Sequence, residues 1–127
     1  ENKDYVSRSD ELGNIHISGE VLASIAAAAA LEVEGVSGLS ANLGSDIAEL
    51  LSNKKNLTKG VHIQVEDEQV TVELAVLMSY GHTIPEVGRA VQDAVKSSVE
   101  SMTGLTVAAV NVGVGGITLE KKEQQTG

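Results

Sequence analysis

Three histidines are the residues of this chain best suited to bind a metal ion or to move a proton near neutral pH. They are His16, His62 and His82, and their spacing fits no known pattern of metal ligands. His16 and His62 alternate with apolar residues, which predicts strands whose histidines point away from the core. Cysteine is absent, and no Gly-x-Ser-x-Gly sequence supplies a serine nucleophile. We therefore expect no enzyme activity, no metal ligands and no cofactor.

Two short motifs are similar to ion-binding loops, and each is better explained as ordinary structure. Glu66-Asp67-Glu68 is acidic but lacks the spaced oxygen ligands of a calcium loop, which indicates a solvated turn. Gly113-Val114-Gly115-Gly116 is rich in glycine, as phosphate-binding loops are, but no helix follows it to direct backbone N–H groups at a phosphate. We expect this glycine-rich segment to be a flexible exit from the last strand.

The composition of the chain excludes two further classes of partner. It has 127 residues, with 9 Lys plus Arg against 18 Asp plus Glu, so its formal net charge is −9. Binding along a nucleic-acid backbone depends on Lys and Arg, and the basic cluster here is only Lys54, Lys55 and Lys59. Two tyrosines are the only aromatic residues, too few to stack bases. The longest apolar run, Val21 to Leu31, is shorter than the roughly 18 residues that indicate a membrane span, so we expect neither nucleic-acid binding nor a direct membrane span.

The elements that carry these residues are predicted from hydrophobic periodicity. Periods of two and of about 3.6 residues both occur, which predicts an α+β domain with a small mixed sheet of about four or five strands and two long helices packed on it. Residues 12–118 are expected to form this single domain. Segments 1–11 and 119–127 are polar and are expected to be flexible.

Local signals set the bounds of the predicted elements. Ser18 is suited to cap the first helix, Pro85 to begin the second and Gly104 to end it. The expected strands are 15–17, a hairpin of 60–66 and 70–76, and a last strand of 105–107 and 110–114, in which Ala108 and Ala109 change the face. The apolar stripe of the second helix, expected to face the core, is Ile84, Val87, Val91, Val95, Val99 and Met102.

A shift of 66 residues aligns the two predicted helices and suggests an internal strand-helix-strand repeat. It places Glu20-Val21 on Glu86-Val87 and Gly38-Leu39 on Gly104-Leu105. In this interpretation Gly38 ends the first helix as Gly104 ends the second. Chance similarity between two capped helices is the alternative.

The aligned helices differ on one face. Where the second helix has Arg89, Gln92, Asp93 and Lys96, the first has Ala23, Ala26, Ala27 and Ala30. The first helix therefore lacks the charged face that is usual on a protein surface. Alanine is the best helix former, so the face could be a plain exposed surface. Small side chains also let another subunit or partner approach closely, and we take the four alanines as the candidate interaction surface.

Short motifs spread over residues 12 to 118 together resemble the alkaline shock protein family of bacterial envelope-stress proteins. No single motif is specific, whereas their order and spacing are. The motifs are Ile15-His16-Ile17-Ser18-Gly19-Glu20-Val21, Gly35-Val36, Lys59-Gly60-Val61, Tyr80-Gly81, Val91-Gln92, Met102-Thr103-Gly104-Leu105 and Val110-Asn111-Val112.

This resemblance implies an abundant, non-enzymatic, cytoplasmic protein, chiefly of Gram-positive bacteria, that serves cell-envelope homeostasis. It also implies self-association into a homo-oligomer and a peripheral position at the inner face of the membrane, held by a membrane-anchored protein partner. The family has no established catalytic residues, so none is assigned here. The alternative is a regulatory subunit that binds an enzyme of lipid or envelope metabolism.

Overall fold

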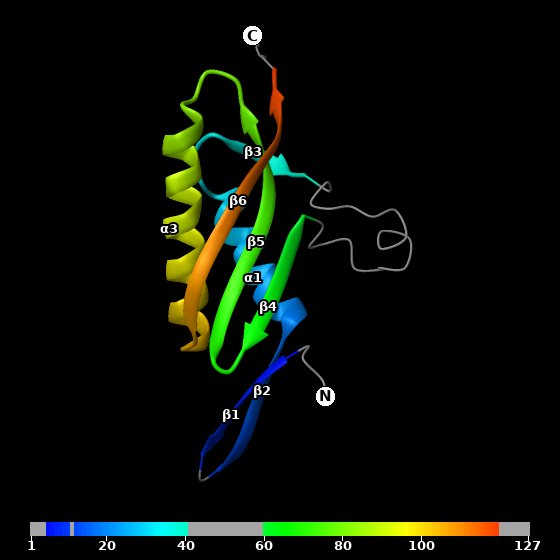
Figure 1. Ribbon diagram of the computed structural model, residues 1–127, viewed down its shortest axis with the longest axis vertical. Helices are drawn as coiled ribbons and strands as arrows, with labels where there is room; N and C mark the ends of the chain where they lie inside the picture. The colour runs from blue at the N-terminus through cyan, green and yellow to red at the C-terminus, as the bar shows by residue number, and fades with distance from the viewer. Residues whose placement is uncertain (1–4, 11, 41–59, 120–127) are drawn as a thin grey trace, which may run out of the picture.

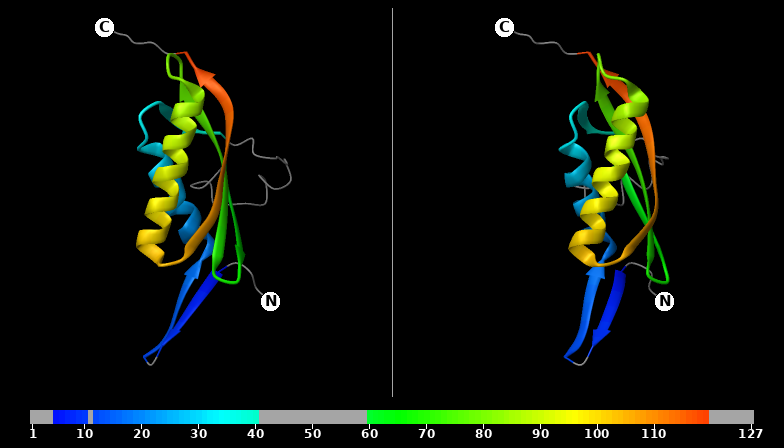
Figure 2. Two further views of the ribbon diagram at one scale, coloured as in Figure 1. Left: turned by 60° about the vertical axis from the view of Figure 1, so that its left-hand side comes forward. Right: turned by 90° about the vertical axis from the view of Figure 1, so that its left-hand side faces the viewer.

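The computed structural model describes residues 5–10, 12–40 and 60–119. They form a four-stranded mixed sheet with two helices on one of its faces, and a separate two-stranded hairpin that projects from one end (Figures 1 and 2). The predicted α+β class, the mixed sheet and the two long helices are confirmed.

The sheet is built around one long central strand, β5 (Gln69–Ser79). On one side of β5, β4 (Val61–Glu66) pairs antiparallel with its first half and β3 (Val36–Leu39) pairs antiparallel with its second half. On the other side, β6 (Thr106–Thr118) runs parallel to β5 along its whole length. Both outer edges of the sheet are therefore formed by strands other than β5, and β6 is the longer edge.

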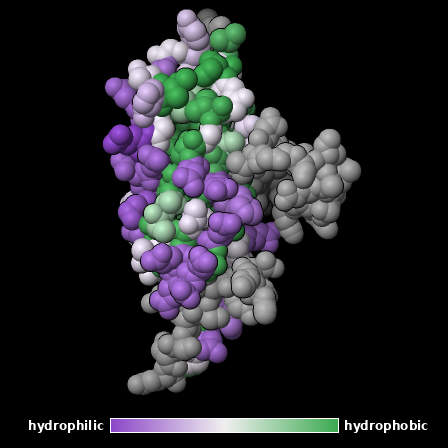
Figure 3. All heavy atoms as spheres, viewed as in Figure 1, coloured by the Kyte–Doolittle hydropathy of each residue, from purple (hydrophilic) through white to green (hydrophobic). Residues whose placement is uncertain are grey.

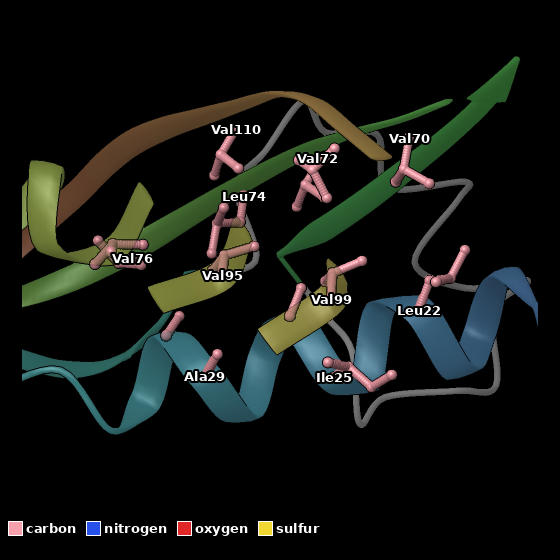
Figure 4. Close-up of a cluster of buried hydrophobic side chains, with 14 of the residues drawn as sticks. Leu22, Ile25, Ala29, Val70, Val72, Leu74, Val76, Val95, Val99 and Val110 are labelled. Atoms are coloured by element: carbon pink, nitrogen blue, oxygen red, sulfur yellow. The ribbon is translucent and has the colours of Figure 1, made fainter. Parts of the chain in front are cut away.

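The core lies between the sheet and the helices. Alternate residues of β5 point toward the helices and are fully buried, namely Val70, Val72, Leu74, Val76 and Met78. Figure 4 shows these β5 valines and Leu74 facing side chains of both helices, including Leu22, Ile25 and Ala29 from the first and Val95 and Val99 from the second. An aliphatic core of this kind follows from a sequence without Phe or Trp.

Helix α3 (Ile84–Thr103) follows the predicted bounds: Pro85 lies in its first turn, and Gly104 leaves it with a left-handed φ of 78°. The four valines of its stripe, from Val87 to Val99, are buried as expected. The buried stripe is shorter than predicted at both ends, because Ile84 is 46% and Met102 69% exposed. Both lie in the end turns of the helix, beyond the valines that contact the core.

Helix α1 (Gly19–Leu31) begins where the sequence predicts, since the Ser18 hydroxyl accepts a hydrogen bond from the Val21 N–H at 3.2 Å. The prediction that Gly38 ends this helix is wrong. The helix ends at Leu31, and Gly38 lies inside β3. The turn between them is made at Gly35, which has a left-handed φ of 102° that glycine adopts without strain. The order strand-helix-strand does occur twice, but the strand before α1 is not part of the four-stranded sheet.

The N-terminal residues include a strand that the sequence analysis missed. β1 (Tyr5–Asp10) pairs antiparallel with β2 (Gly13–Ser18), so the segment 1–11, which was expected to be flexible, includes a strand that the sequence pattern did not predict. Strand pairing requires only backbone groups, and this hairpin therefore forms without the alternating apolar pattern on which the prediction relied. Figure 2 shows it extending away from the body of the molecule.

Strand β6 corrects one further prediction. Gly113–Gly116 is not an exit from the sheet, because β6 continues through it to Thr118. The ladder with β5 shifts register between Val107 and Ala109, where the change of face was expected, and again between Val114 and Gly116. The lysines at 54, 55 and 59 and the tail at 120–127 lie outside the described residues.

Candidate interaction surfaces

The four alanines of the candidate surface are covered by the chain itself. Ala26 and Ala30 are fully buried, and Ala23 and Ala27 are each 5% exposed. The interpretation of this face as a plain exposed surface is therefore wrong. Burial within one chain already accounts for the missing charges, because an ionised side chain is costly to bury without a partner. Contact of these alanines with another molecule stays a prediction.

The exposed face of α1 is a different and largely uncharged set of residues. Val21 and Leu31 are each 47% exposed, and Ser24 and Ala28 lie between them on the same side of the helix. Periodicity alone could not separate this face from the buried one, because apolar residues occupy nearly the whole circumference of α1.

The histidines lie on three separate elements: His16 on β2, His62 on β4 and His82 in the turn before α3. All three side chains are exposed. In the described part of the chain, no group of three or more His, Cys, Asp or Glu residues is arranged to hold a metal ion. The acidic motif lies at the turn between β4 and β5, as predicted: Glu66 ends β4, and Asp67, at a left-handed φ of 62°, and Glu68 form the turn.

The outer edge of β6 is partly covered by polar side chains from α3. Glu100 Oε2 accepts a hydrogen bond from the Val107 N–H at 2.8 Å, and Lys96 Nζ donates one to the Val107 carbonyl at 3.2 Å. Gln92 Nε2 donates to the Val110 carbonyl at 3.0 Å. These three residues, which we call the edge-capping row, occupy positions i, i+4 and i+8 of one helix face. They bond backbone groups that a second strand would otherwise use.

The charges of the edge-capping row reinforce each other. Lys96 Nζ and Glu100 Oε2 form an ion pair at 3.0 Å. The hydrogen bond from the Val107 N–H, followed by that from Lys96, lowers the pKa of the Glu100 carboxyl below its ordinary value of 4.5. Glu100 is therefore ionised at neutral pH and stays a pure hydrogen-bond acceptor at the strand edge.

The second half of β6 lacks such a cap in the described structure. Successive residues of a regular strand direct their backbone groups to opposite edges. The capped groups show that the backbone groups of Val107 and Val110 point to the outer edge, on either side of the register shift at residues 107–109. Counting on from Val110, the outward-facing residues are Val112 and Val114, and no described side chain bonds their backbone groups. We call residues 111–118 the open edge of β6.

The helix-free face of the sheet is apolar at the same end of the molecule. Leu77 on β5 lies between Gly38 on β3 and Gly116 on β6, where added Cβ atoms would be 3.7 Å and 3.2 Å from its methyl groups. Figure 3 shows hydrophobic residues gathered over the upper part of this view and hydrophilic residues over the lower part and the α3 side. The open edge of β6 borders the apolar part.

Comparison with known proteins identifies the family of this chain. Residues 7–119, which include almost all of the described fold, match the profile of the alkaline shock protein 23 family, described as having a cell envelope-related function. The chain belongs to the alkaline shock protein family. The resemblance predicted from short motifs is thereby confirmed.

Relatives of this alkaline shock family chain are similar along most of their length. It is 32% identical over 114 residues to the uncharacterized protein YqhY of Bacillus subtilis (strain 168), covering 90% of this chain and 84% of that protein. It is 28% identical over 112 residues to a Streptococcus pyogenes serotype M3 protein named stress response regulator gls24 homolog, covering 88% of this chain and 62% of that one.

A solved structure is more distantly similar. A MamM CTD variant superposes with a TM-score of 0.48 at 12% sequence identity, over 77% of this chain and 94% of the other. At this level the likeness carries no functional argument. Within residues 5–10, 12–40 and 60–119, no helix has the length and apolar character needed to cross a membrane.

The edge-capping row and the open edge were missed by the sequence analysis, which took Gln92 and Lys96 for part of a solvated helix face. A signal for both was present. The segment from Leu105 to Leu119 contains no charged residue, although the family member has a formal net charge of −9. An uncharged strand that follows a helix with polar residues every four positions indicates a sheet edge that the helix protects.

Proposed function

We propose that this protein is a non-enzymatic structural component of cell-envelope stress homeostasis. In this role it self-associates and is held at the inner face of the cytoplasmic membrane by a membrane-anchored protein partner. The observation that carries the proposal is the match of residues 7–119 to a family with a cell envelope-related function. The stress-related part is supported by the relative named as a stress response regulator.

The described surfaces favour binding to proteins over catalysis. The three histidines lie on separate elements, so the groups most suited to proton transfer or metal binding do not converge. In contrast, an uncharged sheet edge and a largely uncharged helix face are exposed. Exposed apolar surface of this kind is typical of protein contacts.

The charge of the chain favours an indirect attachment to the membrane. The cytoplasmic leaflet carries a negative surface potential that attracts basic segments. A chain with 18 acidic and 9 basic residues is repelled by such a surface. Association with the envelope therefore depends on a protein that is itself inserted in the membrane.

Fractionation of cells that naturally contain the protein tests this attachment. We expect the protein in the membrane pellet and its release by alkaline carbonate without detergent. We also expect the purified protein not to sediment with protein-free vesicles of anionic phospholipid. Residence in the soluble fraction alone, or binding to protein-free vesicles, would contradict attachment through a partner.

Self-association is tested separately by light scattering on the purified protein. We expect the mass to rise with concentration above that of one 13.2 kDa chain. A strict monomer at every concentration would contradict the structural role.

A further inference from the structure

The edge-capping row protects only part of the β6 edge and leaves the rest open to strand pairing in the described structure. On α3, Gln92 bonds the Val110 carbonyl and marks the point where protection of β6 ends. From there the outward backbone groups of Val112 and Val114 have no bonding partner in the described structure. Unpaired edge groups are the template on which another strand adds to a sheet.

Gly113, between these two valines, is not required by the packing of the chain itself. Gly115 and Gly116 have internal reasons to be glycine, since added Cβ atoms would lie 2.5 Å from Ser40 Oγ and 3.2 Å from a Leu77 methyl group. An added Cβ on Gly113 would meet only the Leu74 carbonyl oxygen, at 3.9 Å. Glycine weakens a strand, and one without an internal reason marks a place where another backbone approaches closely.

The surroundings of the open edge suit contact between two like-charged copies. The chain has a net charge of −9, so two copies repel each other overall, and close contact costs least where the meeting surfaces are uncharged. No charged residue occurs from Leu105 to Leu119. Beside the open edge, Val114 is 37% and Ile117 42% exposed, and both lie on the helix-covered face of the sheet, where they can pack against a neighbouring strand.

We propose that two copies of this chain pair antiparallel through the open edges of β6, with a two-fold axis at Gly113. This pairing rests on the self-association in the proposed function. The sequence is symmetric about that point, because a valine lies on each side of the glycine. On the axis, Gly113 faces its own copy, and each Val112 faces the Val114 of the other copy.

The backbone directions agree with this register. The backbone N–H and C=O groups of Val112 and Val114 point to the outer edge. Each opposed valine pair therefore exchanges both of its N–H···O=C bonds, while the two Gly113 residues form the close, non-hydrogen-bonded pair between them. Opposed valines also contribute favourable side-chain contact on the face of the sheet. Gln92, bonded to Val110, ends the ladder on each side. The two sheets thereby become one continuous sheet with all helices on the same face.

The absence of native cysteine allows the register to be tested by disulfide formation. In the proposed dimer, Gly113→Cys brings two thiols together on the axis, within the Cα separation of about 4.4 to 6.8 Å that a disulfide needs. Asn111→Cys is the matched control on the same strand face. Its two copies lie four residues out of register, about 13 Å apart, and cannot join. We expect mild oxidation to link the first variant at least about tenfold faster than the second, under conditions where the wild type self-associates.

A second variant tests the edge by affinity. Val114→Pro removes an N–H that points outward, so it leaves the bonds to β5 intact while breaking a bond to the other copy. We expect the dissociation constant to rise at least about tenfold, with an unchanged circular dichroism spectrum. Val114→Lys should show the same loss as Val114→Pro. Ser97→Lys on the exposed face of α3 makes the same change in net charge and should not raise the dissociation constant.

The outcomes separate the pairing from the proposed function. Fast linking at position 113 and weak association of the Val114 variants support the pairing. If the wild type self-associates but position 113 links no faster than position 111 and Val114→Pro associates normally, the β6 pairing is overturned and self-association stands. A wild-type protein that stays monomeric overturns both, whatever its location in the cell.

Discussion

Glu100 shows how one side chain connects a helix to the edge of the sheet. Its carboxylate accepts from the Val107 N–H and pairs with Lys96, so it satisfies a strand and neutralises a helix charge at once. Val107 follows Glu100 by only seven residues, but Gly104 must first reverse the chain. A contact across such a reversal depends on backbone geometry that residue spacing does not specify.

The charge of Glu100 makes a contribution to stability that depends on pH. Because the pKa of this carboxyl is lowered in the folded protein, its contribution is fully present above the ordinary pKa of 4.5 and is lost as the pH falls through the lower, folded value. Glu100→Gln keeps a hydrogen-bond acceptor but removes this dependence. We expect the free energy of unfolding in urea to fall less steeply in the variant than in the wild type below about pH 4.5.

The control for this measurement is Ser97→Ala, a change on the exposed face of the same helix. It neither adds nor removes an ionisable group, so it should leave the acid slope of the wild type unchanged. Equal slopes for Glu100→Gln and the wild type would show that the bond from Val107 does not favour the ionised carboxyl.

Ser18 gives a second prediction at this scale. Its hydroxyl accepts from the Val21 N–H and caps α1, so Ser18→Ala should lower the free energy of unfolding by about 1 kcal/mol. Ser24→Ala, an exposed change within the same helix, should be neutral or slightly stabilising because alanine favours helices. Chemical denaturation of the two variants under identical conditions measures the difference. Equal effects would mean that the cap contributes nothing.

Residues such as Ser18, Pro85 and Gly104 were predictable because their roles depend on neighbours within one helical turn. Ala26 and Ala30 were not, because their burial depends on elements distant in sequence. The hairpin of β4 and β5 was predicted for the same local reason, while the parallel pairing of β5 with β6 joins segments separated by a whole helix. Strand order therefore could not be derived from periodicity.

At the scale of the element, α1 is buried on the face that its alignment with the charged face of α3 suggested to be an exposed surface. Its buried side includes seven residues, and four of them are the alanines aligned with exposed polar residues of α3. The internal repeat therefore aligns helices with different environments. The two faces of α1 can be distinguished by placing the same charge on each.

Ala26→Asp and Ala28→Asp form this matched pair. Ala26 is fully buried, so an aspartate there should lower the free energy of unfolding by about 4 kcal/mol or more, or prevent folding. Ala28 is exposed, and the same substitution should cost only about 0.7 kcal/mol through helix propensity. Thermal and urea denaturation of both variants checks the difference. Similar losses at both positions would contradict the orientation of α1.

At the scale of the whole molecule, the net charge of −9 acts against every contact between copies. The β6 pairing avoids local repulsion because the meeting strands are uncharged, but the rest of each surface still contributes a long-range term. Salt screens this term: the Debye length falls from about 30 Å at 0.01 M to about 8 Å at 0.15 M ionic strength. A contact held by apolar packing and backbone bonds is itself little weakened by screening.

Self-association should therefore become tighter, by several-fold, as sodium chloride rises from about 0.01 to about 0.15 M. Chloride is preferable to sulfate, which strengthens apolar association by exclusion from the surface. Glu66→Gln combined with Glu68→Gln changes the net charge from −9 to −7, since two negative charges are removed. The two positions lie at the end of β4 and in the turn that follows it. This variant should associate more tightly than the wild type at low salt and respond less to salt. Association that weakens with added salt would instead indicate an interface held by ion pairs, which β6 cannot supply.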